Sequence, residues 1–247
     1  MGIKRIKLVE KRDYPEVRKL YKFFEVSNDG EVCLAVGGDG TFLKAAREFE
    51  GPILPVRGGE EDSLGFHADF TVRDMDEIIL NLTDSLYTIR EYPKLQVAFK
   101  NNIYEAVNDV ALLRATPKTI HCRIYYYENG ERELLYPKDL KGDGVIFSGQ
   151  IGSTAYNYFA HGPIIYGLDA IVVTPILASY DVSVVSKKVF YTEVTKNIAT
   201  LESDGVELGK LSTGDSFIVE ESDKKVKIIT LRKKESFSQK FSRLHRF

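Results

Sequence analysis

A continuous apolar run that ends in a glycine-rich turn is the feature that most constrains the fold of this chain. Residues 32–36 carry no charged side chain, and Gly-Gly-Asp-Gly-Thr follows directly at 37–41. An apolar run without alternation is typical of a strand that is covered on both faces, as in a parallel sheet. Helical spacing continues over 41–49, so the segment predicts a buried strand, a tight turn and a helix.

The first ninety residues repeat this alternation. Strands are predicted at 3–9, 32–36 and 53–56, with helices between and after them. In the first helix, Asp13 is the expected N-cap, with Pro15 in the first turn and Glu16 three residues after the cap. The stripes expected to face the core are Val17, Leu20, Tyr21 and Phe24, and then Met75, Ile78, Ile79, Leu82 and Leu86. This alternation predicts a parallel sheet with right-handed crossovers.

After about residue 92 the pattern becomes mostly β. Turns are predicted at Asn101-Asn102 and, from the hairpin signal Asn-Gly, at 129–130. Several more short strands are expected over 200–231, so residues 91–232 form a β-rich domain of sandwich or barrel type, after an α/β domain at 1–90. Residues 233–247 return to helical spacing, with Ser236 as the expected cap and Phe237, Phe241 and Leu244 as the apolar stripe.

Composition limits the partners and the compartment. The chain has 247 residues, 43% apolar and 28% charged, with a net charge of −2, which gives no general attraction to nucleic acid or to an anionic membrane. Neither a membrane-spanning apolar run nor a signal-peptide core is evident, so we expect a cytoplasmic protein. Cys33 and Cys122 are expected as buried free thiols. The four histidines are too scattered to predict a metal site, and a solvated loop is favoured for Glu60–Asp62.

The glycine turn has the layout of a phosphate site. Glycines remove side chains that would block a ligand, and the N–H groups of a helix N-terminus favour an anion. The two common nucleotide loops, G-x-G-x-x-G and G-x-x-x-x-G-K-[ST], are absent. Asp39 could take a proton from an attacking hydroxyl or hold Mg²⁺ against a phosphate, as in phosphoryl transfer. The alternatives are that Asp39 only caps the helix and that Lys44 is a solvated lysine, not a counter-charge for the ligand.

At this point the sequence resembles a family. Gly-Gly-Asp-Gly-Thr marks a kinase superfamily that includes NAD kinases, diacylglycerol and sphingosine kinases and phosphofructokinases. Five further segments resemble NAD kinases in particular, in the family order and within about residues 30–215. They are LGFHADF (64–70), NDV (108–110), KGDGVIFSGQIGSTAYNYFAHGPII (141–165), VTPI (173–176) and SDG (203–205).

The resemblance implies that the γ-phosphoryl group of a donor moves to the 2′-hydroxyl of the adenosine ribose of NAD, giving NADP. It implies ATP or polyphosphate as donor with Mg²⁺, no resident metal site, and a homodimer or homotetramer. The site would lie in the cleft between the two domains, with the C-terminal helix packed on the first. Asp39 would be the catalytic base. The residues implied to bind the nucleotides are Gly37, Gly38, Gly40, Thr41, Lys44, Phe66, Asn108, Asp109, Lys141, Asp143, Thr154, Ala155, Tyr156 and Asn157.

Plain structural alternatives stay open for several of these residues. Asn108-Asp109 could be a strand-entry turn, the glycines around Asp143 a β-turn, Ser153 a helix cap, and Phe66 and Tyr156 core residues. The chain also departs from the family pattern, with Arg57 where asparagine is usual, Asp109 for glutamate, Gly149-Gln150-Ile151 for Thr-Pro, and Val206 for glutamine. A phosphate contact by Arg57 is a further hypothesis. The rival functions are a lipid or sugar kinase of the superfamily and an NAD(P)-binding sensor without turnover.

Overall fold

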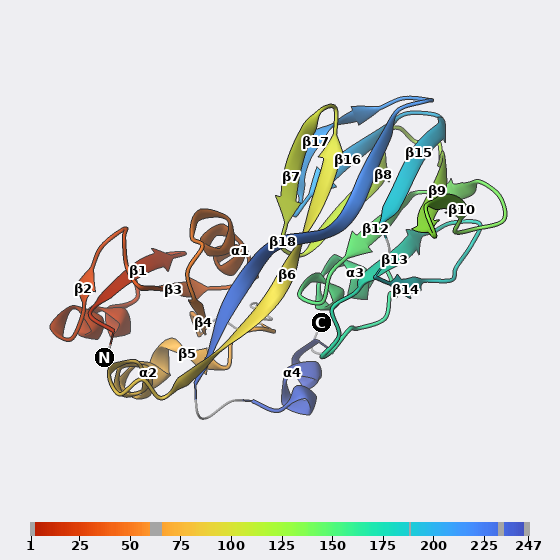
Figure 1. Ribbon diagram of the computed structural model, residues 1–247. Helices are drawn as coiled ribbons and strands as arrows, with labels where there is room; N and C mark the ends of the chain where they lie inside the picture. The colour runs from red at the N-terminus through yellow and green to blue at the C-terminus, as the bar shows by residue number, and fades with distance from the viewer. Residues whose placement is uncertain (1–2, 60–65, 188, 232–234, 245–247) are drawn as a thin grey trace. The chain divides into compact units, whose positions relative to one another are not determined.

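The computed structural model describes residues 3–59, 66–187, 189–231 and 235–244 (Figure 1). The chain forms two compact units, Met1–Tyr92 with Lys225–Phe247, and Pro93–Lys224. Two long strands, β6 (Tyr87–Phe99) and β18 (Ser216–Leu231), begin in one unit and end in the other. The second boundary therefore falls inside β18, earlier than the residue 232 expected from the sequence.

The first unit is built on a parallel sheet. Its strand order is β18-β4-β3-β1-β2, with β5 beside β4. The strands are β1 (Arg5–Glu10), β2 (Glu25–Val26), β3 (Val32–Gly37), β4 (Ile53–Arg57) and β5 (Phe70–Thr71). The helices are η1 (Pro15–Lys22), α1 (Asp39–Glu48), η2 (Val72–Asp74) and α2 (Met75–Thr83). Every residue of β3 is buried, which agrees with its unbroken apolar sequence.

Two helix details differ from the sequence predictions. Tyr14, not Asp13, is the N-cap of η1, and Asp13 pairs with Arg18. Because η1 is a 3₁₀ helix with three residues per turn, Val17 and Leu20 share the buried face while Tyr21 is turned to solvent. Leu86 is also exposed, since α2 ends at Thr83 and Ser85 follows with a φ of 55°.

The second unit is β-rich, as predicted. One sheet has the antiparallel order β14-β13-β12-β8-β16-β17, and the other contains β10-β9-β15-β18, with β11 beside β9 and β7 beside β6. A shared core, in which the Phe147 ring contacts those of Phe190 and Phe217, joins the two sheets as a sandwich. The remaining strands are β7 (Asn102–Ala106), β8 (Asp109–Arg114), β9 (Ile120–Glu128), β10 (Glu131–Leu134), β11 (Leu140–Gly142), β12 (Gly144–Ser148), β13 (Ile171–Ile176), β14 (Val184–Ser186), β15 (Phe190–Lys196), β16 (Ala199–Ser203) and β17 (Val206–Leu211).

The predicted turns are present with small shifts. Asn129 and Gly130, with φ of 50° and 84°, join β9 to β10 and confirm the hairpin. The turn between β6 and β7 is formed by Lys100 and Asn101, one residue earlier than predicted. Of the short strands expected over 200–231, β16 and β17 are present, while the last, β18, continues for 16 residues.

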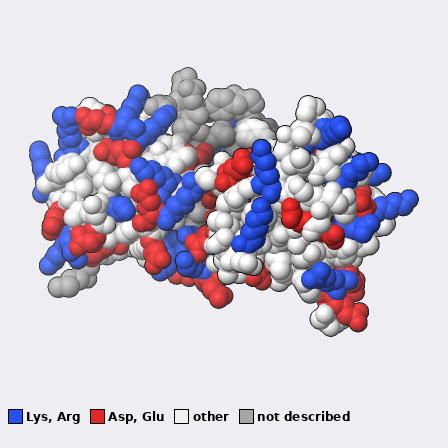
Figure 2. Space-filling model, turned by 90° about the horizontal axis from the view of Figure 1, so that it is seen from above, with Lys and Arg blue, Asp and Glu red and all other residues white. Residues whose placement is uncertain are grey.

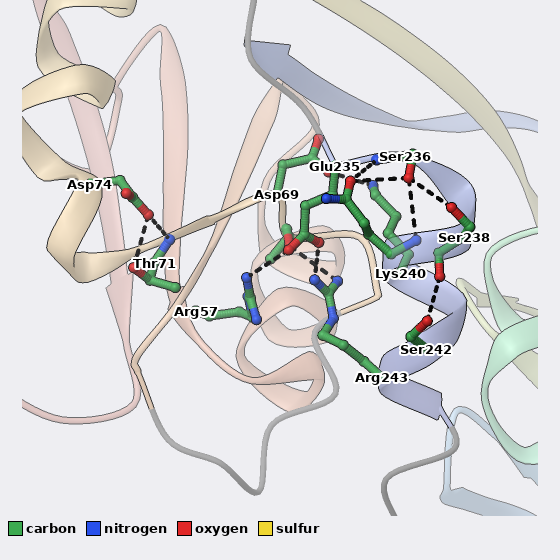
Figure 3. A network of polar contacts seen from close by, with 12 residues as sticks. Arg57, Asp69, Thr71, Asp74, Glu235, Ser236, Ser238, Lys240, Ser242 and Arg243 are labelled. Carbon is green, nitrogen blue, oxygen red and sulfur yellow. Dashed lines mark hydrogen bonds and ion pairs between the residues drawn. The ribbon is translucent and has the colours of Figure 1, made fainter.

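The C-terminal helix α4 (Phe237–Leu244) packs within the first unit, as expected (Figure 3). Ser236 and Gln239 form a capping box, because each backbone N–H donates to the other side chain, at 3.3 and 2.8 Å. Glu235 accepts from Arg57 at 3.2 Å and from Arg243, and Lys240 pairs with Asp69 at 2.6 Å. The acidic run 60–62 and the first two residues of the 64–70 segment lie outside the described residues.

Within the described part of the chain, no helix is long and apolar enough to cross a membrane. Figure 2 shows basic and acidic side chains interspersed over one face of the protein.

Candidate active site

The glycine turn lies at the carboxyl edge of the parallel sheet. β3 ends at Gly37 between β1 and β4, and ligands of open α/β sheets bind beyond this edge. Gly37 has a φ of +154°, and a Cβ added there would lie 2.4 Å from Thr41 Oγ1. The Gly38 carbonyl accepts from the N–H groups of Thr41 and Phe42, at 3.0 and 3.2 Å. The turn therefore requires glycine at 37 for reasons internal to the protein.

Asp39 occupies the first position of α1. The N-cap is Gly38, which has no side chain, so the alternative that Asp39 caps this helix is wrong. The Gly40 backbone is exposed, and a Cβ added there would meet no atom of the described residues within 4 Å, apart from its chain neighbours. Packing within the described chain thus does not require glycine at 40. Lys44 is exposed one turn further along α1.

Basic and aromatic side chains surround this edge of the sheet. The backbone N–H of Lys11, directly after β1, donates to the Val36 carbonyl at 3.0 Å. Arg57 is in register with Gly37 on the neighbouring strand, but its guanidinium pairs with Glu235, which argues against the predicted phosphate contact. Phe66 is buried and makes edge contacts with His67 and Phe237, as a core residue would.

In the second unit, the Asn108-Asp109 segment opens strand β8. The N–H groups of Val107, Asn108 and Asp109 donate to the two carboxylate oxygens of Asp204, at 2.9, 2.7 and 3.2 Å. The N–H of Asp204 in turn donates to the Asp109 carbonyl at 2.9 Å. The segment is thus more than a strand-entry turn, because a side chain from β16–β17 holds its backbone.

The Gly-Ser-Thr-Ala-Tyr segment packs against the other side of Asn108. A Cβ added at Gly152 would lie 1.9 Å from the Asn108 carbonyl oxygen. The same oxygen accepts from the Gly149 N–H at 3.3 Å and from the Ser148 hydroxyl at 3.2 Å. Two of the sequence motifs, about forty residues apart, therefore meet in space.

After Gly152, the side chains of Ser153 and Thr154 are buried and bond to the loop backbone, whereas the ring of Tyr156 is exposed. Ser153 does not cap α3 (Tyr156–Phe159), whose N-cap is Ala155; its hydroxyl donates to Gln150 O and accepts from Ile165 N–H. The Thr154 hydroxyl is buried and donates to Ile151 O at 3.2 Å. Tyr156 remains 40% exposed, so its ring is open to a ligand and is not a core residue.

The structure corrects the expectation for Asn157. Its side chain is 0% exposed. Its amide donates to Ser153 O and Pro163 O, and its oxygen accepts from the Thr174 hydroxyl. These bonds occupy the side chain inside the protein, which leaves Asn157 as a support for the loop and not as a direct contact to a nucleotide.

Acidic side chains gather around Asp109 and Tyr156. Burial, followed by the nearby Asp204 and Glu202 carboxylates, raises the pKa of Asp109 to about 7. Burial, together with Asp109, Glu202 and Asp143, also raises the pKa of Tyr156. Asp143 pairs with Arg114 at 3.1 Å. A group that changes charge near neutral pH, beside an exposed tyrosine, is typical of a binding or catalytic site.

Lys141 belongs to a different sheet from the strands that carry Asp109 and follow Asp143. It is exposed on β11, opposite His121 of β9, while Asp143 directly precedes β12.

Three residues that the sequence did not single out as site residues are Gly152, Glu202 and Asp204. Gly152 and Asp204 had a signal, because they lie in the 141–165 and 203–205 segments that resemble NAD kinases, but neither segment predicted a contact with Asn108. Within the described residues, no group of three or more His, Cys, Asp or Glu side chains could hold a metal ion.

Two family models match the chain. Residues 4–87 match the ATP-NAD kinase N-terminal domain, and residues 107–231 match the ATP-NAD kinase C-terminal domain. An NAD kinase of Natranaerobius thermophilus is 31% identical over 221 residues, which cover 85% of this chain and 75% of the relative. An NAD kinase of Caldicellulosiruptor saccharolyticus is 30% identical over 206 residues, which cover 81% and 77%.

Solved structures share the fold at lower identity. A crystal structure of an NAD kinase from Archaeoglobus fulgidus in complex with ATP superposes with a TM-score of 0.77 at 20% identity, covering 97% of this chain and 98% of the other. A yeast NADH kinase complexed with NADH superposes with a TM-score of 0.81 at 18% identity, covering 100% and 88%.

Proposed function

The chain belongs to the NAD kinase family, and from this premise we propose that it phosphorylates the 2′-hydroxyl of the adenosine ribose of NAD to give NADP. The observation that carries the proposal is Asp39, at the open N-terminus of α1 in a chain that matches both family domains. The rival lipid or sugar kinase finds no comparable support, since the curated relatives are named NAD kinases.

Asp39 is the proposed general base. A carboxylate can accept the proton of the ribose hydroxyl as that oxygen attacks the phosphorus atom, and general bases contribute typically 10²–10⁴-fold to rate. The glycines beside Asp39 leave room for the reacting groups, and the α1 N-terminus favours the negative charge of the transferred phosphoryl group. Asn108, Asp109 and Tyr156 are the proposed dinucleotide contacts, through amide, carboxyl and ring.

The proposed donor is ATP or polyphosphate, with Mg²⁺. The A. fulgidus relative was solved with ATP, which supports ATP here. Mg²⁺ is commonly held by one or two carboxylates plus substrate phosphates, so it needs no cluster of protein ligands. We therefore propose that the donor phosphates would hold Mg²⁺, while Asp39 serves as the base. When bound, Mg²⁺ would neutralise the developing charge on the donor.

We further propose NAD, NADP and ATP as the small-molecule ligands, a homodimer or homotetramer, and a cytoplasmic location. Cys33 and Cys122 are both free and buried, which fits a reducing compartment.

The test is NADP formation from NAD with Mg²⁺ and either ATP or polyphosphate. We expect Asp39→Asn to lower kcat at least about a hundredfold with its melting temperature unchanged. Glu48→Gln, at the exposed far end of the same helix, is the matched control and should keep wild-type activity. Wild-type protein that binds NAD but forms no NADP with either donor would instead indicate a sensor.

A further inference from the structure

The turn between β16 and β17 reaches across the sheet to the Asn108-Asp109 segment. We propose that Asp204 is a positioning residue of the dinucleotide site, which holds the backbone of residues 107–109 and thereby fixes the arrangement of the Asn108 and Asp109 side chains. The proposal rests on the proposed function of that segment. It assigns a task to a residue that the sequence marked as part of a turn and of the 203–205 segment, with no role of its own.

Turn geometry alone does not explain an acid at this position. Asp204 and Gly205 have φ of 47° and 74°, as in the two-residue hairpin turns that favour Asn-Gly at least as much as Asp-Gly. Three N–H donors share the two carboxylate oxygens of Asp204. An asparagine has one acceptor oxygen, and its NH₂ group would face a backbone donor. The three donors therefore select aspartate over asparagine.

The strand register explains why Asp204 can contact residues that are so distant in the sequence. Ser203 of β16 pairs with Val110 of β8, so the turn that follows Ser203 lies beside the residues that precede Val110. The hydrogen bonds then join residues 95 to 97 positions apart. On the opposite side, Ser148, Gly149 and Gly152 hold the Asn108 carbonyl. Asp204 therefore holds the backbone N–H groups of residues 107–109, and residues 148–152 hold the carbonyl of Asn108.

The same carboxylate also acts on Asp109 through its charge. The ionisable groups that face Asp109 are Asp204 from the turn, Glu202 from β16 and Tyr156 from α3. Burial is the largest cause of the raised pKa of Asp109, and Asp204 is the second. Removing the charge at 204 should lower that pKa while loosening the segment. A residue with only a structural role would leave the pH dependence unchanged.

The experiment compares four proteins by isothermal titration with NAD and by NADP formation, each from pH 5.5 to 8.5. In Asp204→Asn, we expect the Kd and KM for NAD to rise at least about tenfold, with a smaller change in kcat. The pH inflection near 7 should move to lower pH. Glu202→Gln removes a charge but none of the three hydrogen bonds, so it should move the inflection with a smaller rise in KM. Asp215→Asn is the matched control.

Asp215 accepts the Ser212 N–H at 2.7 Å in another turn of the same unit, so its variant should behave as wild type. Unchanged affinity and an unchanged inflection in Asp204→Asn would overturn the proposal. If wild type binds NAD without turnover, the proposed function fails, and the binding constants still decide this inference. If Asp204→Asn does not fold, hydrogen exchange on wild type decides it, because fast exchange of all three amides of 107–109 would exclude the hydrogen bonds.

Discussion

At the scale of single residues, Gly40 separates the demands of the ligand from those of the fold. A Cβ at this position meets nothing within 4 Å in the part of the chain that the structure describes, and alanine favours a helix over glycine by about 1 kcal/mol. Gly40→Ala should therefore melt at the same or a higher temperature than wild type. Its rate of NADP formation should fall at least about tenfold, because the added methyl occupies the space beside Asp39. Full activity in this variant would show that the ligand does not use that space.

Gly152 has the opposite character. Its added Cβ would lie 1.9 Å from the Asn108 carbonyl oxygen, so Gly152→Ala must displace the Asn108 backbone. We expect it to weaken NAD binding at least about tenfold and to destabilise the fold by about 1–3 kcal/mol. Gly149→Ala is the matched control three residues earlier, where the added Cβ would make ordinary contacts from 3.8 Å. Equal behaviour of the two variants in urea denaturation and NAD titration would contradict this packing.

Asp109 links stability to pH. Its pKa is raised from 3.8 to about 7, so the folded state holds this proton more tightly than the unfolded state does. That contribution is fully present below about pH 4 and is lost as pH rises through 7. Asp109→Asn lacks this titration, so its stability relative to wild type should increase from pH 5 to pH 8, by at most about 2.7 kcal/mol. Urea denaturation at several pH values measures it, and a constant difference would contradict the burial of an ionisable Asp109.

At the scale of elements, Glu235 fastens α4 to the first unit (Figure 3). Its carboxylate serves Arg57 and Arg243, whose side chains are 19% and 10% exposed. Glu235→Gln would remove a carboxylate charge that two poorly solvated guanidinium groups share, so we expect a loss of about 2 kcal/mol of stability. Glu91→Gln removes the more exposed pair with Lys225 and should cost less than about 0.5 kcal/mol. Equal losses in urea denaturation would mean that the Glu235 pairs are as weak as surface pairs.

The elements that the sequence predicted well are those fixed by local chemistry. Asn129-Gly130 forms its hairpin because few residue pairs adopt two positive φ values, and Ser236 with Gln239 forms a capping box within four residues. The sequence could not show that η1 would be a 3₁₀ helix, which turned Tyr21 outward. The sequence analysis also expected short strands where β18 is continuous, since the polar residues in the middle of β18 suggest turns. The strands that pair with β18 and keep it extended are distant in the chain.

The site divides in the same way. Gly37–Thr41 could be predicted because strand, turn and helix are consecutive in the chain. The role of Asp204 could not, since its three partners become neighbours only through the pairing of β8 with β16. Asn157 was misjudged for the related reason that its burial depends on Pro163 and Thr174, which the motif does not contain.

At the scale of the whole molecule, each unit carries one cysteine that can report its opening. Cys33 of β3 and Cys122 of β9 are both 0% exposed, and burial raises the pKa of each thiol to about 12. The thiolate is the reactive form, so neither should react with an alkylating reagent at pH 8 until its unit opens. Alkylation in increasing urea, with each cysteine resolved by peptide mass spectrometry, follows the two units separately in the wild-type protein.

We expect both cysteines to become reactive at the same urea concentration. The reason is that β6 and β18 each begin in one unit and end in the other, so neither unit can lose these strands while the other keeps them whole. NAD at a hundred times its Kd should protect both thiols by about 2.7 kcal/mol, because its binding stabilises the folded chain as a whole. Labelling of Cys33 at lower urea than Cys122, or protection of Cys122 alone, would show instead that the shared strands do not couple the two units.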